Sequence, residues 1–262
     1  MIAQEVVNIV LGLAPRSGEI KGDENGLLYG DPNTKVTGIA TTWTPSVKVL
    51  TQAAAENLNF VLTHEILWFP SSKLGWYATL AQEDRPHNIA RRKILDQHRM
   101  VVCRCHSNWD PIEGEGIADS CARTLGFGQP IYKSRYLRMY EVAPQTLAQL
   151  ADHCKARLAV PQVRVAGDLN RVVRKIGIAY GGFGQSWQCL DEFIVQRADA
   201  VIIGEAIDYT IRAAIDAGLG YIETTHVGSE NPGMASFARL LKERLPGIPV
   251  RFIDAGHPWV YR

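Results

Sequence analysis

Apolar and polar positions follow one another along this chain in blocks that predict helices and strands in turn. The first block predicts an amphipathic helix, because its apolar residues have helical spacing: Ile2, Val6, Ile9, Val10 and Leu13. Short apolar runs such as "VTGIATTW" and "LNFVLTHE" then predict strands, and "PSVKVLTQAAAEN" between them predicts a helix with Pro45 in its first turn. Strands that alternate with helices form largely parallel sheets. We therefore predict an α/β fold with largely parallel mixed sheets and helices on both faces.

The second half of the chain repeats this plan. The segments "VRKIGIAYGGFG", "DAVIIGEA", "LGYIETTH" and "IPVRFID" predict strands, and helical patterns separate them. The last of these helices is expected to start at Pro232, and an earlier one to be capped near Pro144 and Gln145. Between the first helix and the first strand, "GDENGLLYGDPNTK" predicts turns. Residues 70–98 predict a loop followed by a helix.

Two segments resemble each other and suggest two lobes. Residues 38–65 and 177–205 each read as a strand, a turn of small residues, a helix and a strand that ends on a glutamate. The alternative is that any two such units look alike. We expect an N-terminal lobe at residues 1–130 and a C-terminal lobe at residues 131–262. Because open α/β sheets bind ligands at the carboxyl ends of their strands, two facing lobes would share one cleft.

Composition narrows the class of protein. The 262 residues carry a net charge of +1 without a block of like charge, so we expect no nucleic-acid partner. No apolar run reaches the ~18 residues of a membrane span, and the start of the chain does not resemble a signal peptide. Five cysteines in a chain of this length fit reduced thiols in a cytoplasmic protein. Cys103 and Cys105 are either buried small side chains or a metal-binding pair.

Side chains that bind metals recur where the predicted strands end. They are His64 and Glu65, His106 and Asp110, Glu205, and His226 with Glu230. Imidazole and carboxylate groups are ligands of borderline and hard divalent cations. Each residue alone also has a simpler explanation, such as a hydrogen-bonded strand end, a turn, or the flank of a helix. Their repetition at one topological position favours a metal site.

The glycines of "AYGGFGQSW" follow a predicted strand and precede a helix. Gly181, Gly182 and Gly184 lack the spacing of a P-loop or of a dinucleotide fingerprint. They predict either a tight turn without a ligand or a wall of a phosphate or metal cleft.

Seven motifs in order resemble the NIF-three-like family of dinuclear metal-centre proteins, some of which carry the name GTP cyclohydrolase type 2. The segments are "DENGLLYGDP", "LTHEILWF", "CHSNWDPIEGEGIADSCARTLGF", "YGGFGQSW", "ADAVIIGE", "THVGSENPGM" and "IDAGHPWVYR". The resemblance implies a homohexamer with two divalent ions per chain (Fe, Mn, Zn or Mg). It also implies a set of metal ligands: His64, Glu65, Asp110, His226 and Glu230.

Two departures from the family pattern concern the site. Glu65 stands where the family has its second histidine, and Thr41 and Thr42 occupy the region of a family aspartate. A carboxylate still binds divalent metals, but it shifts the preference toward iron, manganese or magnesium.

Together these features predict a metal-dependent hydrolase, and the resemblance implies that its substrate is a nucleotide-like or phosphorylated small molecule. His106 is expected to move a proton, with Glu205 as the second candidate. The alternative is a metal-binding oligomer that regulates or scaffolds without catalysis.

Overall fold

The computed structural model describes residues 1–69, 85–260 and 262, and its chain forms two compact units. Unit 1 contains Met1–Ile112 and Met234–Arg262, and unit 2 contains Glu113–Gly233. These bounds differ from the lobes expected at residues 1–130 and 131–262, because the last strand pairs with a strand of the N-terminal half.

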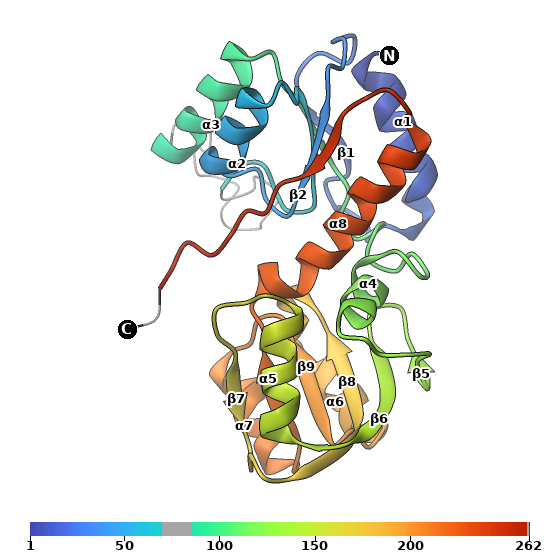
Figure 1. Ribbon diagram of the computed structural model, residues 1–262, viewed down its shortest axis with the longest axis vertical. Coiled ribbons are helices and arrows are strands. Elements are labelled where there is room, and N and C mark those ends of the chain that lie inside the picture. Colours follow the sequence, from blue (N-terminus) through green and yellow to red (C-terminus); the bar gives the residue numbers. More distant parts are fainter. Residues whose placement is uncertain (70–84, 261) are drawn as a thin grey trace. The chain divides into compact units, whose positions relative to one another are not determined.

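Unit 1 is built on a five-stranded sheet with the order β1-β4-β3-β2-β11 (Figure 1). Strands β2, β3, β4 and β11 are parallel to one another, and β1 pairs antiparallel with β4 at one edge. Its strands are β1 (Gly26–Tyr29), β2 (Ile39–Thr42), β3 (Phe60–Thr63), β4 (Val101–Arg104) and β11 (Val250–Phe252). Its helices are α1 (Ala3–Leu13), α2 (Val47–Ala55), α3 (Pro86–Gln97) and the C-terminal part of α8 (His226–Arg244).

Helices cover both faces of this sheet, as predicted. On one face lie α2 and α3, and on the other lie α1 and α8 (Figure 1). The α2–α3 face buries a core against the sheet that includes Leu50, Leu95, Val61 and Val102, each at most 1% exposed. On the other face, the rings of Trp109 and Phe237 stack with centroids 4.0 Å apart.

Unit 2 is built on a six-stranded sheet with the order β5-β6-β8-β9-β10-β7. The central strands β8, β9 and β10 are parallel, and the outer pairings are antiparallel. Its strands are β5 (Tyr132–Lys133), β6 (Arg138–Thr146), β7 (Arg164–Ala166), β8 (Val172–Ala179), β9 (Ala200–Ile203) and β10 (Gly220–Glu223). Its helices are α4 (Ile117–Thr124), α5 (Leu147–Arg157), α6 (Trp187–Val195), α7 (Asp208–Asp216) and the start of α8.

Two apolar layers fill unit 2, one on each face of its sheet. Helices α4 and α5 pack on one face through residues such as Cys121 and Leu150. Helices α6 and α7 pack on the other through residues such as Phe193 and Ala214. The two segments that resemble each other are therefore both parallel strand–helix–strand units, β2-α2-β3 and β8-α6-β9.

Several local expectations need correction. The turn-rich segment after α1 contains β1. Helix α8 begins at His226, six positions before Pro232, so that proline lies inside the helix. The caps also move, because Ser46 caps α2 and Thr146 caps α5 with side chains that accept from the backbone. Of the expected loop and helix, α3 is observed, and residues 70–84 lie outside the described part of the chain.

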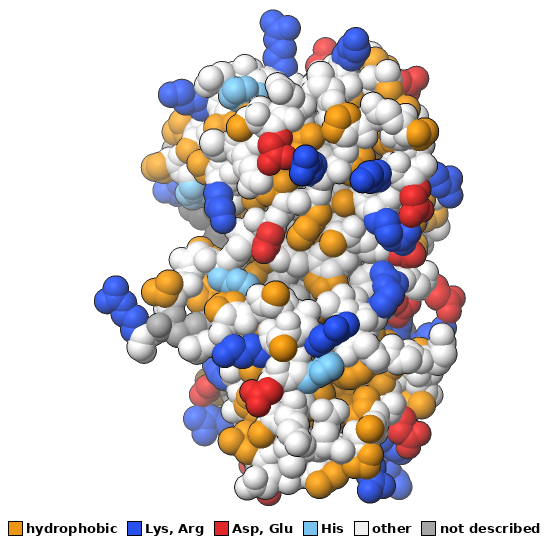
Figure 2. Space-filling view, viewed as in Figure 1, with side chains coloured by type: hydrophobic (Ala, Val, Ile, Leu, Met, Phe, Trp, Pro, Cys, Tyr) orange, Lys and Arg blue, Asp and Glu red, His pale blue; other side chains and the backbone are white. Residues whose placement is uncertain are grey.

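Charged side chains of both signs are interspersed on the face of the molecule shown in Figure 2. Among the described helices, none has the length and apolar character needed to cross a bilayer.

Candidate metal centre

In unit 1, two neighbouring parallel strands end at the same edge of the sheet and carry the predicted ligands. Strands β3 and β4 are in register, with Thr63 opposite Arg104. His64 follows β3 directly, and the loop after β4 contains His106 and Asp110. The amide of Cys105 also donates to the carbonyl of Thr63 at 3.0 Å, which extends the pairing beyond the strand ends. Strand pairing thus brings together residues more than forty positions apart.

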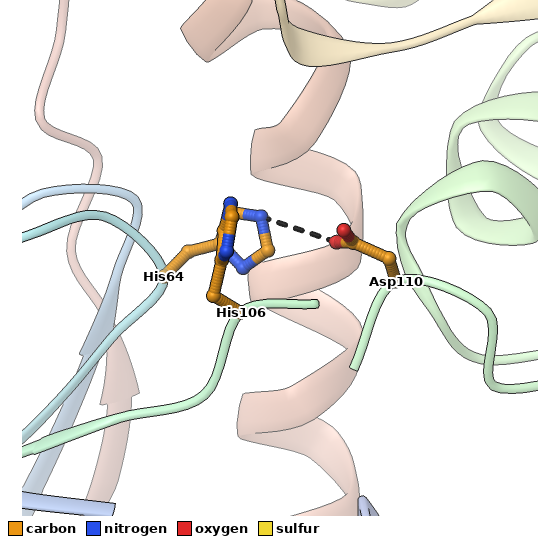
Figure 3. Close-up of side chains that lie close together, drawn as sticks. All are labelled: His64, His106 and Asp110. Atoms are coloured by element: carbon orange, nitrogen blue, oxygen red, sulfur yellow. Dashed lines mark ion pairs between the residues drawn. The ribbon is translucent and has the colours of Figure 1, made fainter. Parts of the chain in front are cut away.

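His64 is fully buried and held by a hydrogen bond to the backbone. Its Nδ1 lies 3.0 Å from the carbonyl oxygen of Cys105. Because a carbonyl only accepts, Nδ1 carries a proton and donates it there. The other ring nitrogen, Nε2, lies 3.3 Å from Oδ1 of Asp110 (Figure 3). Asp110 is 3% exposed, so its carboxylate is almost completely removed from water.

His106 is oriented by a carboxylate that the sequence analysis did not single out. Nδ1 of His106 lies 2.9 Å from Oδ2 of Asp23, which also accepts from the amide and hydroxyl of Ser107. Asp23 Oδ1 accepts from the guanidinium of Arg104 at 2.6 Å. Burial alone would raise the pKa of Asp23, but the hydrogen bond from His106 and the charge of Arg104 hold this pKa well below its usual range.

Glu65 lies at the edge of this cluster. Its Oε1 is 3.9 Å from Nε2 of His106, and its side chain is 19% exposed. One ligand atom each from His64, His106 and Asp110 lie within 4.8 Å of one another, so these three residues can hold a metal ion.

Unit 2 contains a second histidine with a similar arrangement. His226 is the first residue of α8, shortly after β10, and Glu205 follows β9, the parallel neighbour of β10. Nδ1 of His226 lies 2.9 Å from Oε2 of Glu205, whose Oε1 accepts from the side-chain amide (Nε2) of Gln185 at 2.7 Å. Nε2 of His226 lies 3.3 Å from Oε1 of Glu230, which is one helical turn further on and 3% exposed.

The backbone conformation at the start of α8 determines where the side chains of His226 and Glu230 lie. Thr225 has a φ of +78°, which is unfavourable for a β-branched residue, and its hydroxyl accepts from the amide of Gly228 at 3.0 Å. This cap starts α8 at His226 and puts His226 and Glu230 on one face of its first turns.

Gly181 leaves the space that the Glu230 carboxylate occupies. Its φ is +52°, and a Cβ at this position would lie 2.0 Å from Oε1 of Glu230 and 3.0 Å from Nε2 of His226. The glycine turn, which forms a 3-10 turn at Gly181–Phe183, is therefore tight and also adjoins the candidate ligands.

The chemical character of Cys103 and Cys105 differs from that of the candidate metal ligands. Cys103 and Cys105 are both fully buried, and burial raises the pKa of Cys103 to about 12. A thiol with such a pKa does not ionise readily, which fits the interpretation of these residues as buried small side chains.

A cavity of about 810 Å³ in unit 1 lies at the opposite end of the sheet. Lys35, Asn59 and Met100, which precede β2, β3 and β4, are among its lining residues. The candidate ligands follow these strands, so they do not belong to this cavity.

Comparisons with known proteins agree with the motifs. Over residues 1–258 the chain matches the family described as Duf34/NIF3 (NGG1p interacting factor 3). A GTP cyclohydrolase 1 type 2 homolog from Clostridium perfringens is 26% identical over 256 residues, which cover 94% of this chain and 93% of that protein.

Solved structures show the same fold. A Bacillus cereus protein related to NIF3 has a TM-score of 0.82 at 15% identity, with 100% of this chain and 99% of that chain covered. The Staphylococcus aureus hypothetical protein SA1388 has a TM-score of 0.81 at 21% identity, with the same coverage. The resemblance found in the sequence is confirmed, and the chain belongs to the Duf34/NIF3 family.

Proposed function

We propose that this protein binds two divalent metal ions and acts as a metal-dependent hydrolase on a nucleotide-like or phosphorylated small molecule. The proposed ligands are His64, Glu65 and Asp110 in unit 1, and His226 and Glu230 in unit 2. That they form one dinuclear centre, in a homohexamer, stays a prediction from the resemblance.

One observation carries the metal-binding part of the proposal: the same arrangement occurs in both units. His64 and His226 each engage Nδ1 with an oxygen acceptor, at 3.0 and 2.9 Å. Each then presents Nε2 to a buried carboxylate oxygen at 3.3 Å. Histidines that bind metals are typically held in this way, with the second ring nitrogen donating to a carbonyl or a carboxylate.

The residues fit a divalent cation on chemical grounds. Asp110 and Glu230 are each 3% exposed, and a buried carboxylate is costly unless a cation or hydrogen bonds compensate it. Bound divalent ions would supply Lewis acidity and an activated water, which is the chemistry of metal-dependent hydrolysis.

The remaining polar residues act on the orientation of the histidines. Glu205 holds the tautomer of His226 by accepting from its Nδ1, and Gln185 fixes Glu205 in turn. We therefore assign Glu205 an orienting role in place of the proton transfer expected from the sequence. The substrate class rests on the relatives named GTP cyclohydrolase 1 type 2 homolog.

The alternative function is a metal-binding regulatory or scaffold oligomer without turnover. Both functions need the ligands, so metal content alone does not separate them. Chelator-sensitive hydrolysis supports the enzyme, and tight metal without turnover on any substrate supports the scaffold.

The test begins with elemental analysis of protein purified without added metal, followed by a screen of nucleotides and phosphoesters with and without chelator. His226→Ala should lower the metal content. His153→Ala is the matched control, because His153 lies in the same unit and its Nε2 also faces an oxygen acceptor, the carbonyl oxygen of Leu125 at 2.6 Å. Equal metal content in both variants and the unchanged protein would contradict the ligand assignment of His226.

A further inference from the structure

His64, His106 and Asp110 converge within unit 1 from the loops that follow two adjacent strands (Figure 3). We infer that these three residues form a complete divalent-cation site by themselves, with His106 as a ligand, so that unit 1 binds one ion without His226 or Glu230. This inference rests on the proposed function and deepens it, because it assigns His106 to metal binding.

Hydrogen bonds fix the same tautomer on both imidazoles. Nδ1 of His64 faces the Cys105 carbonyl at 3.0 Å, and Nδ1 of His106 faces Asp23 Oδ2 at 2.9 Å. Carbonyl and carboxylate oxygens only accept, so each Nδ1 carries the proton. In a neutral imidazole Nε2 then offers a lone pair, which is the form of histidine that ligates metals. The rings lie close, with centroids 4.8 Å apart.

Asp110 supplies the negative charge of the site. Its side chain is 4% exposed, and within the described part of the chain no hydrogen-bond donor reaches Oδ1. Asp23, by contrast, is compensated by the guanidinium of Arg104 at 2.6 Å. The buried carboxylate that needs a cation is therefore Asp110.

The distance between Nε2 of His64 and Oδ1 of Asp110 fits a shared cation better than a direct hydrogen bond. A charge-assisted N–H···O bond would bring this nitrogen and oxygen to about 2.7–2.9 Å. Two ligand atoms at about 2.1 Å from one ion, separated by a tetrahedral angle, are about 3.4 Å apart. Nε2 of His64 and Oδ1 of Asp110 are separated by 3.3 Å.

Two imidazoles and one carboxylate favour a borderline divalent cation such as Zn²⁺ or Fe²⁺ over Mg²⁺. Three protein ligands also leave coordination positions for water or substrate. Since a lone pair given to a metal ion does not accept a proton, this assignment replaces the proton-transfer role expected for His106.

The experiment titrates metal-stripped, full-length protein with Co²⁺, whose visible absorption reports nitrogen ligation, and counts bound metal by elemental analysis. The background is the double variant His226→Ala/Glu230→Ala. We expect it to retain one Co²⁺ per chain. Adding Asp23→Asn should weaken binding by roughly 10- to 100-fold, the usual effect of removing a partner that orients a ligating histidine, and adding His106→Ala should weaken it further.

His98→Ala is the matched control, because His98 is an exposed imidazole of the same unit. Circular dichroism and a metal-free melt show that each variant folds, and the change in the Co²⁺ spectrum separates loss of a nitrogen ligand from a general loss of stability.

The outcomes separate this inference from the proposed function. If the unchanged protein binds no Co²⁺, both are overturned. If it binds Co²⁺ but the folded double variant does not, unit 1 is not a complete site, and the proposed function stands. If His106→Ala leaves the affinity and the spectrum of the double variant unchanged, His106 is not a ligand.

Discussion

Replacing Gly181 by alanine should displace the proposed metal ligand Glu230 without changing that residue itself. Gly181 has a φ of +52°, and its added methyl group would lie 2.0 Å from Oε1 of Glu230. Carbon and oxygen atoms that are not bonded do not approach so closely, so the carboxylate must retreat by about 1 Å or more. Metal–ligand distances tolerate only about ±0.2 Å, so a displacement of this size removes the ligand.

This substitution affects the free energy of unfolding in two ways, through the backbone strain of alanine and through loss of the metal ion. The left-handed backbone conformation costs alanine roughly 1 kcal/mol more than glycine. For a chain of this length that lowers the melting temperature by about 2–4 °C. A metal ion present at ~1,000 times its dissociation constant stabilises the native state by about 4 kcal/mol, or roughly 8–16 °C. Loss of the ion therefore exceeds the backbone cost several-fold.

The assay is a thermal melt in chelator and in added Zn²⁺ or Mn²⁺, together with metal content per chain. Gly126→Ala is the matched control in the same unit, because Gly126 has a φ of +77° and nothing lies within 4 Å of an added methyl group. In chelator both variants should melt a few degrees below the unchanged protein. In metal, only Gly126→Ala should recover the full rise.

The reasoning is wrong if Gly181→Ala shows the same metal content and the same metal-dependent rise as Gly126→Ala. Such a result would mean either that Glu230 does not bind metal or that the helix accommodates the methyl group without moving the carboxylate. Metal content of Glu230→Ala distinguishes these two explanations.

Three further predictions concern other parts of the chain. Glu65→Gln keeps the shape of the side chain but removes its charge, so the metal-dependent rise in melting temperature should shrink; an unchanged rise would show that Glu65 is not a ligand. Arg197→Gly should stabilise the fold by about 0.5–1 kcal/mol in a denaturant melt, because Arg197 has a φ of +57° after α6 and glycine prefers this conformation; a loss of stability would contradict this. Light scattering should give the mass of a hexamer, and a monomer near 29 kDa at micromolar concentration would exclude the predicted assembly.

The alternation of apolar runs and helical patterns predicted the parallel strands of the two sheets, because buried parallel strands are apolar throughout. Residues 60–63 and 200–203, for example, are buried along their whole length. The alternation did not predict the short antiparallel strands β5 and β7. Strand β1 escaped prediction because Gly22 and Gly30 mark turns on both sides of a short strand that itself begins with Gly26. This strand is defined by its antiparallel pairing with β4, which local sequence does not reveal.

The start of α8 was misplaced because proline normally occupies the first turn of a helix. Pro232 lies instead in the second turn, where it cannot donate a hydrogen bond to the carbonyl four residues earlier. The true start depends on Thr225, whose hydroxyl caps the helix from a left-handed backbone conformation that sequence patterns do not suggest for threonine. This cap decides that His226 and Glu230 share a helical face.

Some residues of the candidate site could be predicted from the sequence, and others depend on how distant segments fold together. Ligand-type residues at strand ends were predictable, since the carboxyl ends of parallel strands meet at one edge of a sheet. Asp23 was not, because it lies 83 positions from His106 in a segment that reads only as turns. Its role depends on the fold of that segment against the loop after β4.

The position of Asp23 bears on the effect of glutamate at position 65. From the sequence alone, Glu65 makes the ligand set richer in carboxylates and favours harder cations. The structure brings a second imidazole, His106, to His64 and Asp110, and Asp23 keeps this imidazole in the tautomer that presents Nε2. A site with two nitrogen donors favours Zn²⁺ or Fe²⁺, even if the carboxylate of Glu65 also binds the ion at the edge of the site. The metal preference of unit 1 should therefore depend more on Asp23 and His106 than on residue 65, and comparing the Zn²⁺ and Mg²⁺ affinities of Asp23→Asn and Glu65→Gln tests this order directly.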